Sequence, residues 1–353
     1  MSANLDISPR GGERYPKFTT VGGGVFSLGF AATVQAAVAT TATSDGMTFS
    51  EAIYEALLKC QGQDQDEPVE PAALEQGLRV ANNILRSWQT RGLHQWRRQE
   101  VVLPLNVGQV EYFLGDGTDS AYWADEEDFF STTVATAAVA AATTLVLTDA
   151  GDYVNADFVG IELSDGTRQW TTATKSSNTL TLAAALTANV SANASVYFFT
   201  ARPSRPLRAI HARRRSSIDS ADIPVRIEAH NFYRDQPMKN SNGTVVHVYY
   251  QPVLGTYGKL FVWQPSNSVT QQLRLTVERK FTIGTSGADT IDIPDEWNDA
   301  FIYRIAVRLE PTFGHLDGMR VKHLRDDADR LEADALGFDD DTGSIYFAPS
   351  RRR

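Results

Sequence analysis

The spacing of apolar residues changes twice along this chain, and these changes limit what it can fold into. Near each end, apolar residues recur every three or four positions, which is typical of amphipathic helices. Between the ends they alternate with polar residues, which is typical of strands with one buried face. Because a helical pair cannot bury its apolar stripe alone, we expect both ends to form one helical bundle, with a long antiparallel β excursion between them.

Two helices are predicted between residues 48 and 92. Thr48, followed three residues later by Glu51, is a capping box that marks a helix start. The first apolar face carries Phe49, Ile53, Leu57 and Cys60, and the second carries Leu74, Leu78, Ala81, Leu85 and Trp88. The lone cysteine is therefore expected to be a buried core residue and not a nucleophile.

Two further helices are predicted after Pro294, a residue that suits a first helical turn. The first apolar face carries Trp297, Phe301, Ile305 and Leu309, and its predicted end lies at Pro311 and Gly314. The second carries Leu324, Ala328, Leu331 and Ala335 and is predicted to end at Gly337.

The middle of the chain reads as strands. Residues 101–105 and 110–114 are predicted to form a hairpin around the turn at 106–108. Further strands are predicted at 225–227, 245–250, 257–263 and 273–281. In the last of these, Leu273, Leu275 and Val277 alternate with polar residues, which favours a half-buried antiparallel strand.

Residues 131–200 differ from the rest, since they are rich in Ala, Thr and Ser and poor in charge. Five short strands are predicted in this segment, at 145–147, 158–163, 170–174, 180–182 and 196–199. The sequence thus predicts an α+β protein with an adaptor core at 48–130 plus 201–337 and an inserted small β module at 131–200. An N-terminal arm at 1–47 and a tail at 338–353 complete the chain.

The arm contains a stretch without charge, residues 18–44, which has to be tested as a membrane span. Its glycines and many Thr and Ser residues interrupt the run of about 20 apolar residues that a spanning helix needs. A signal peptide is also disfavoured, because the segment before the small-residue motif at 37–39 carries Asp6 and Glu13. We expect a flexible arm, or one ordered against a partner, and no membrane span.

The sequence carries no pattern typical of catalysis. One cysteine cannot form an internal disulfide or a thiolate metal site, and none of the six histidines lies in a zinc-binding helix motif. Residues 255–259 are predicted to form a hairpin turn and not a phosphate-binding loop. The acidic runs 125–128 and 339–341 are interpreted as solvated patches. We therefore expect no enzyme activity, catalytic residue, cofactor or metal.

Charge is distributed in blocks. The net charge of −10 argues against a surface that grips phosphates throughout. Six arginines and no acid lie between 202 and 215, whereas eight acids and one arginine lie between 326 and 341. Such blocks suit contacts between copies or with a complementary partner, although a solvated basic edge strand and a solvated acidic helix fit equally well. The inter-subunit candidates are Arg208, Arg213, Arg214, Arg215, Asp326, Asp327 and Asp329.

Several short motifs follow one another in a distinctive order. They are residues 79–88 (RVANNILRSW), 110–112, 223–225, 249–252, 258–265 (GKLFVWQP), 293–294, 303–309 and 311–314. In this order and spacing the chain resembles the head-to-tail adaptor family of short-tailed bacteriophages, also called head-completion, packaged-DNA stabilisation or tail accessory proteins. The resemblance covers about 48–130 and 201–337, whereas the N-terminal lead and the 131–200 insertion depart from the family.

The resemblance implies a structural virion protein that assembles in the host bacterial cytoplasm as a dodecameric ring. Such a ring joins the portal to the tail nozzle or tail fibres, extends the channel for double-stranded DNA without reading its sequence, and retains the packaged DNA. By the same analogy the tail would reach the portal protein. Its candidate contacts are Ile345, Tyr346, Phe347, Arg351, Arg352 and Arg353.

Two other classes of function stay open. A virion-associated peptidoglycan hydrolase would need a carboxylic acid with a raised pKa beside a partner carboxylate. A carbohydrate- or receptor-binding tail component would need an exposed aromatic platform, for which Trp170 and Tyr153 are the local candidates.

Overall fold

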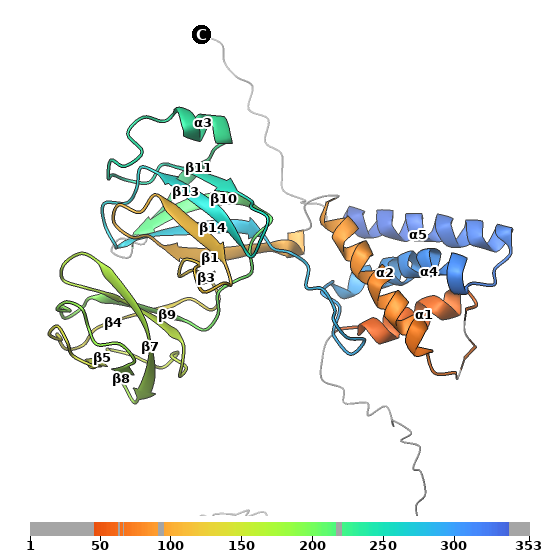
Figure 1. The fold of residues 1–353 in the computed structure, drawn as a ribbon, viewed down its shortest axis with the longest axis horizontal. Coiled ribbons are helices and arrows are strands. Elements are labelled where there is room, and N and C mark those ends of the chain that lie inside the picture. The colour runs from red at the N-terminus through yellow and green to blue at the C-terminus, as the bar shows by residue number, and fades with distance from the viewer. Residues whose placement is uncertain (1–45, 63, 66, 91–94, 217–220, 339–353) are drawn as a thin grey trace, which may run out of the picture. The chain divides into compact units, whose positions relative to one another are not determined.

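The computed structural model describes residues 46–62, 64–65, 67–90, 95–216 and 221–338 (Figure 1). This part of the chain contains five α-helices and two sheets, of eight and six strands, so the predicted mixed α+β class is confirmed. No helix in these described ranges is long and apolar enough to cross a membrane. The N-terminal arm and the C-terminal tail lie outside the described residues.

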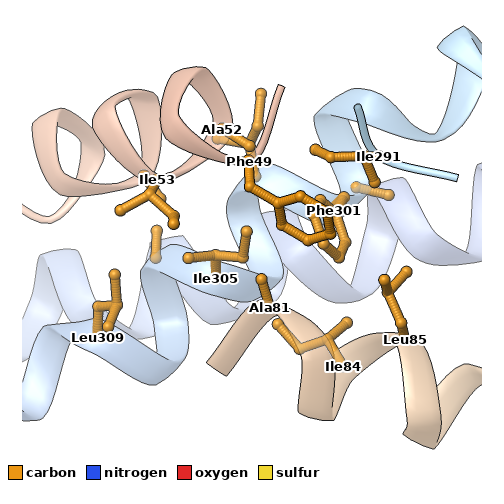
Figure 2. Close-up of a cluster of buried hydrophobic side chains, with 14 of the residues drawn as sticks. Phe49, Ala52, Ile53, Ala81, Ile84, Leu85, Ile291, Phe301, Ile305 and Leu309 are labelled. Atoms are coloured by element: carbon orange, nitrogen blue, oxygen red, sulfur yellow. The ribbon is translucent and has the colours of Figure 1, made fainter. Parts of the chain in front are cut away.

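Helices from both ends of the described chain share one apolar core (Figure 2). These helices are α1 (Phe49–Lys59), α2 (Pro71–Gln89), α4 (Asn298–Phe313) and α5 (Gly318–Phe338). Helix α4 packs against the other three, and its Phe301 ring lies 5.6 Å from the Trp88 ring and 6.5 Å from the Phe49 ring. The predicted capping box at Thr48 is present, and Cys60 is fully buried. Burial raises the pKa of the Cys60 thiol.

The predicted end of α4 at Pro311 and Gly314 is confirmed for the glycine and wrong for the proline. The helix continues through Pro311 to Phe313, and the N–H of the C-cap Gly314 donates to the Glu310 carbonyl. A proline removes one backbone hydrogen-bond donor. This loss is better tolerated in the last turn of a helix, where packing holds the turn, than in the helix interior.

The larger sheet follows the order β2-β13-β12-β11-β10-β14-β1-β3. Its strands are β1 (Arg98–Pro104), β2 (Glu111–Gly115), β3 (Ala124–Asp125), β10 (Arg208–Ser216), β11 (Asp222–Ile227), β12 (His247–Gln251), β13 (Tyr257–Trp263) and β14 (Gln271–Glu278). Neighbours pair antiparallel except β11 and β12, which are parallel. Helix α3 (His230–Asp235) contacts β12, and a short 3-10 turn at Gln95–Arg97 precedes β1. A second 3-10 turn at Asp295–Trp297 leads into α4 and contacts α4 and α5.

The predicted hairpin of 101–114 is wrong, because β1 pairs with β14 and β3 whereas β2 pairs with β13. These two strands lie near opposite ends of the strand order, yet only residues 105–110 join them. Six residues span at most about 20 Å, so the sheet has to curl until its two ends approach each other. The enclosed core contains Leu103 from β1, Tyr112 and Leu114 from β2, and Leu260 from β13.

Residues 130–199 form the second sheet, in the order β4-β9-β6-β7-β8-β5. The strands are β4 (Phe130–Thr133), β5 (Thr144–Val146), β6 (Phe158–Glu162), β7 (Arg168–Ser176), β8 (Thr179–Leu182) and β9 (Ser195–Phe199). Val134 bridges Leu147, and the Thr148 N–H donates to the Thr133 carbonyl at 2.9 Å. These bonds join the first and last strands, so the sheet closes on its own core and adds no strand to the larger sheet.

We predict that Gly77→Ala destabilises the protein, although alanine favours a helix over glycine by about 1 kcal/mol. A β-carbon at position 77 would lie 2.6 Å from Ile53 Cγ2, and such overpacking typically costs about 1–3 kcal/mol. Urea unfolding measures the change. The control is Gly337→Ala, whose β-carbon meets nothing within 4 Å and which should be neutral or stabilising. Equal effects of the two substitutions would contradict this packing of α1 on α2.

Candidate interaction surfaces

The basic block at 208–215 lies on β10, which is an interior strand between β11 and β14 and not the edge strand considered from the sequence. Arg213 pairs with Glu100 at 2.8 Å and with Asp222 at 3.7 Å, and Arg215 pairs with Asp222 at 2.9 Å. Arg214 donates from Nη1 to the Val245 carbonyl at 3.5 Å. The charges of these arginines are therefore largely engaged within their own chain.

Arg208 belongs to a buried ion network. Glu278, 2% exposed, pairs through Oε1 with Arg97 Nη2 at 2.8 Å and through Oε2 with Arg208 Nε. Arg97 is fully buried, and its Nε and Nη2 also donate to the Arg279 carbonyl at 3.3 and 3.2 Å. Burial lowers the pKa of Arg97, and the neighbouring Glu278 opposes that shift. The period-two pattern placed Glu278 on a polar face, so nothing in it indicated this network.

The acidic candidates lie on α5. Asp329 pairs with Arg304 of α4 at 2.7 Å, and Arg304 also contacts Glu332. Asp327 pairs with Arg330 one turn away at 3.1 Å, and Asp326 is exposed. Asp329 is therefore paired with α4 of its own chain, whereas Asp326 is exposed.

Charges of opposite sign are divided between the two halves of α5. Its first half carries Arg320, Lys322, His323 and Arg325, and its second half carries Asp326, Asp327, Asp329, Glu332 and Asp334, with Arg330 as its one base. The helix dipole acts mainly within the first and last turns of a helix. Asp317, just before the first turn, accepts hydrogen bonds from the Met319 and Arg320 N–H groups at 3.1 and 2.9 Å, and the last turn carries no charge. The dipole therefore does not explain the division of charge along α5.

The sequence-predicted portal contacts all lie outside the described residues. They are Ile345, Tyr346, Phe347, Arg351, Arg352 and Arg353. The acidic run 339–341 lies there as well.

The other acidic run, 125–128, bonds to neighbouring segments. Asp125 accepts a hydrogen bond from Gln99 Nε2 at 2.5 Å, and Glu126 pairs with Arg274. Asp128 accepts from the backbone N–H groups of Thr200 and Ala201, both at 3.0 Å, and so joins the two points where the chain enters and leaves the inserted module. No group of three His, Cys, Asp or Glu side chains in the described segments is arranged to hold a metal ion.

A contact zone that the sequence did not indicate joins the inserted module to the larger sheet. Arg168 of β7 donates to the Leu105 carbonyl at 3.3 Å and to the Val269 carbonyl, and its guanidinium lies 5.0 Å from the Tyr197 ring centre. Arg202 donates to the Gly117 carbonyl at 2.8 Å and lies 4.5 Å from the Tyr122 ring centre. Burial lowers the pKa of Arg168. We call this zone the seam.

The two aromatic residues considered for a carbohydrate platform differ in position. Tyr153 is 3% exposed, and its hydroxyl donates to the Ala173 carbonyl at 2.6 Å inside the module core. Trp170 is half-buried at the seam, where its ring stacks on Tyr122 at 4.4 Å with an interplanar angle of 7°. Tyr153 therefore offers no ring face to a ligand, and the two residues form no joint platform.

We predict that Glu278→Gln costs about 3–5 kcal/mol of unfolding free energy, because it leaves Arg97 buried without a counter-charge. Urea unfolding measures the loss. The matched control is Glu75→Gln, which removes an ion pair to Arg79 at 3.4 Å whose side chains are 73% and 69% exposed. That change should stay below about 0.5 kcal/mol. Similar losses in both variants would contradict the larger contribution to stability that we assign to the buried pair of Glu278 and Arg97.

No protein-family model matches this sequence, and a search of curated proteins finds no match to it either. Its function has to be inferred from its residues and their contacts.

Proposed function

We propose that this chain is a structural virion protein: a ring-forming head-to-tail adaptor between the portal and the tail of a short-tailed bacteriophage. The ring extends the DNA channel and retains the packaged DNA. The proposal starts from the ordered motifs that resemble this family. The observation that carries it further is the division of α5 into a basic first half and a mainly acidic second half, which suits contact with a complementary surface.

A closed ring needs a heterologous contact, in which one face of each copy meets a different face of its neighbour. Helix α5 offers a basic half and an acidic half on one element, and Asp326 and Asp334 in the acidic half are exposed. In a neighbouring copy these acids would meet basic side chains. The pairing of Arg213 and Arg215 with acids of their own chain makes β10 a weaker candidate for that contact than the sequence indicated.

Within the proposed ring, α1, α2, α4 and α5 act as the helical bundle formed from both chain ends, and the inserted module is a platform for tail fibres or nozzle subunits. The tail at 338–353 is assigned to the portal, where Tyr346 and Phe347 would be apolar anchors and the terminal arginines would pair with portal acids. An acidic channel wall repels DNA phosphates, so the duplex slides without sticking.

The hydrolase alternative has less support. An acid catalyst for glycoside hydrolysis needs a carboxyl group with a raised pKa. Among the described residues, every carboxyl group with a shifted pKa has it lowered. Hydrogen bonds from Thr48 lower the pKa of Glu51, and those from Thr167 lower that of Asp165. Backbone N–H groups of Ser286 and Thr285 lower the pKa of Asp289.

We predict that the double variant Asp326→Lys/Asp334→Lys assembles poorly on the portal protein. Each reversed surface contact costs about 0.2–1 kcal/mol, and the cost recurs at every subunit boundary. Sedimentation velocity of the purified chain mixed with purified portal measures the assembled fraction. The thermal unfolding temperature of the variant should be unchanged, because both positions are exposed.

The control is Asp152→Lys/Glu127→Lys, which alters net charge equally at two exposed positions away from α5. It should assemble like the unmodified chain. Equal assembly of both double variants would show that the acidic half of α5 takes no part in the subunit contact. That result would contradict the proposed role of α5.

A further inference from the structure

Two exposed arginines on neighbouring helices have no acidic partner within the described residues. Arg86 of α2 donates to the Asn83 side chain at 3.3 Å, and Arg308 of α4 is exposed. Neither forms an ion pair with a carboxylate there. Arg304, one turn before Arg308, differs, because it pairs with two acids of α5. Arg86 and Arg308 can therefore pair with acids from another molecule.

The two arginines lie on one side of the helices, where α2 meets α4. Ser87 of α2 and Arg308 of α4 line the same small notch of about 60 Å³. Asn83 lies one turn before Ser87, so these two residues share a side of α2, and the bond from Arg86 to Asn83 brings the guanidinium to that side. We call the surface that carries Arg86 and Arg308 the arginine face.

The second half of α5 carries acids that are unmatched in the same way. Asp326 and Asp334 are exposed and form no ion pair within the part of the chain that the structure describes. Asp327 and Asp329, by contrast, each pair with an arginine. One copy of the chain thus presents two unpaired acids on α5 and two unpaired arginines on other helices.

The first half of α5 is the competing partner for these acids. Its Lys322 and Arg325 are exposed and also form no ion pair within the described ranges. If they received the acids of another copy, one antiparallel pair of α5 helices would match both halves at once and close a dimer. The arginine face lies on α2 and α4, so an acidic half docked there leaves a second surface of each copy open to a further copy, as a ring requires.

We propose that the acidic half of α5, through Asp326 and Asp334, docks on the arginine face of a second copy of the chain. The inference rests on the proposed ring and identifies the two surfaces that meet at its subunit boundary. A second copy fits better than a nucleic acid, because the chain itself supplies the unpaired acids and carries a net charge of −10. All four side chains are exposed, so the contact weakens as the salt concentration rises.

Sedimentation velocity of the full-length chain at low salt, alone and mixed with purified portal protein, tests the contact. Arg86→Glu/Arg308→Glu should weaken association about tenfold, because two attractions each become a repulsion of similar size. Its thermal unfolding temperature should be unchanged, since both positions are exposed. An equimolar mixture of this variant with Asp326→Lys/Asp334→Lys should associate again, because lysines then meet glutamates and aspartates meet arginines. Both variants keep a negative net charge, so overall attraction does not explain such a recovery.

The matched control is Lys322→Glu/Arg325→Glu, which makes the same change of charge on α5. It should associate like the unmodified chain and should not restore the lysine variant. The proposal is overturned if the mixture with the arginine-face variant stays dissociated, or if the control restores association instead. It is also overturned if Arg86→Glu/Arg308→Glu associates as tightly as the unmodified chain. A loss of duplex DNA binding in a gel-shift assay would then assign these arginines to phosphates.

The outcomes separate the docking surfaces from the proposed function. A ring that forms on the portal and does not respond to Arg86→Glu/Arg308→Glu overturns the arginine face and leaves the ring in place. A recovered contact that yields closed dimers, with no ring on the portal, supports the docking surfaces and contradicts the ring. A chain that stays monomeric, alone and with portal, overturns both.

Discussion

The buried carboxylate of Glu278 joins three segments that are far apart in the sequence. Arg97 precedes β1, Arg208 begins β10, and both strands pair with β14 at the end where Glu278 lies. Glu278 and Arg97 are both buried, so each needs the other, since a buried charge without a partner is costly, whereas the Arg208 side chain is half exposed. The chain leaves the larger sheet after β3 and returns to it at β10, so this network fixes the frame from which the inserted module projects.

The module itself meets the frame through backbone carbonyls, aromatic rings and two arginines. Its six strands close on their own core, which leaves no long strand edge open for pairing with another chain. Arg168 and Arg202 donate to carbonyl groups of the larger sheet and its loops, and Trp170 stacks on Tyr122. These contacts attach the module to the larger sheet at the seam.

The sequence predicted most of what is local and little of what joins distant segments. The capping box at Thr48 and the ladder from Trp297 to Leu309 lie within single helices, and both are present in the structure. The hairpin at 101–114 was wrong because alternation marks a strand without specifying its partner. The interior position of β10 was missed because its arginines were typical of a solvated edge strand or a contact block. Arg168, Tyr122 and Trp170 come together at the seam only through the fold, so no spacing could have indicated it.

The central claim is that this chain is a ring subunit that assembles on a portal, and particle symmetry tests it most directly. Negative-stain microscopy of the purified chain, alone and mixed with purified portal protein, gives the shape and rotational symmetry of what forms. We expect a ring of this chain stacked coaxially on the portal, with the rotational symmetry of a dodecamer. Portal particles that stay unchanged at saturating concentrations of the chain would contradict the account.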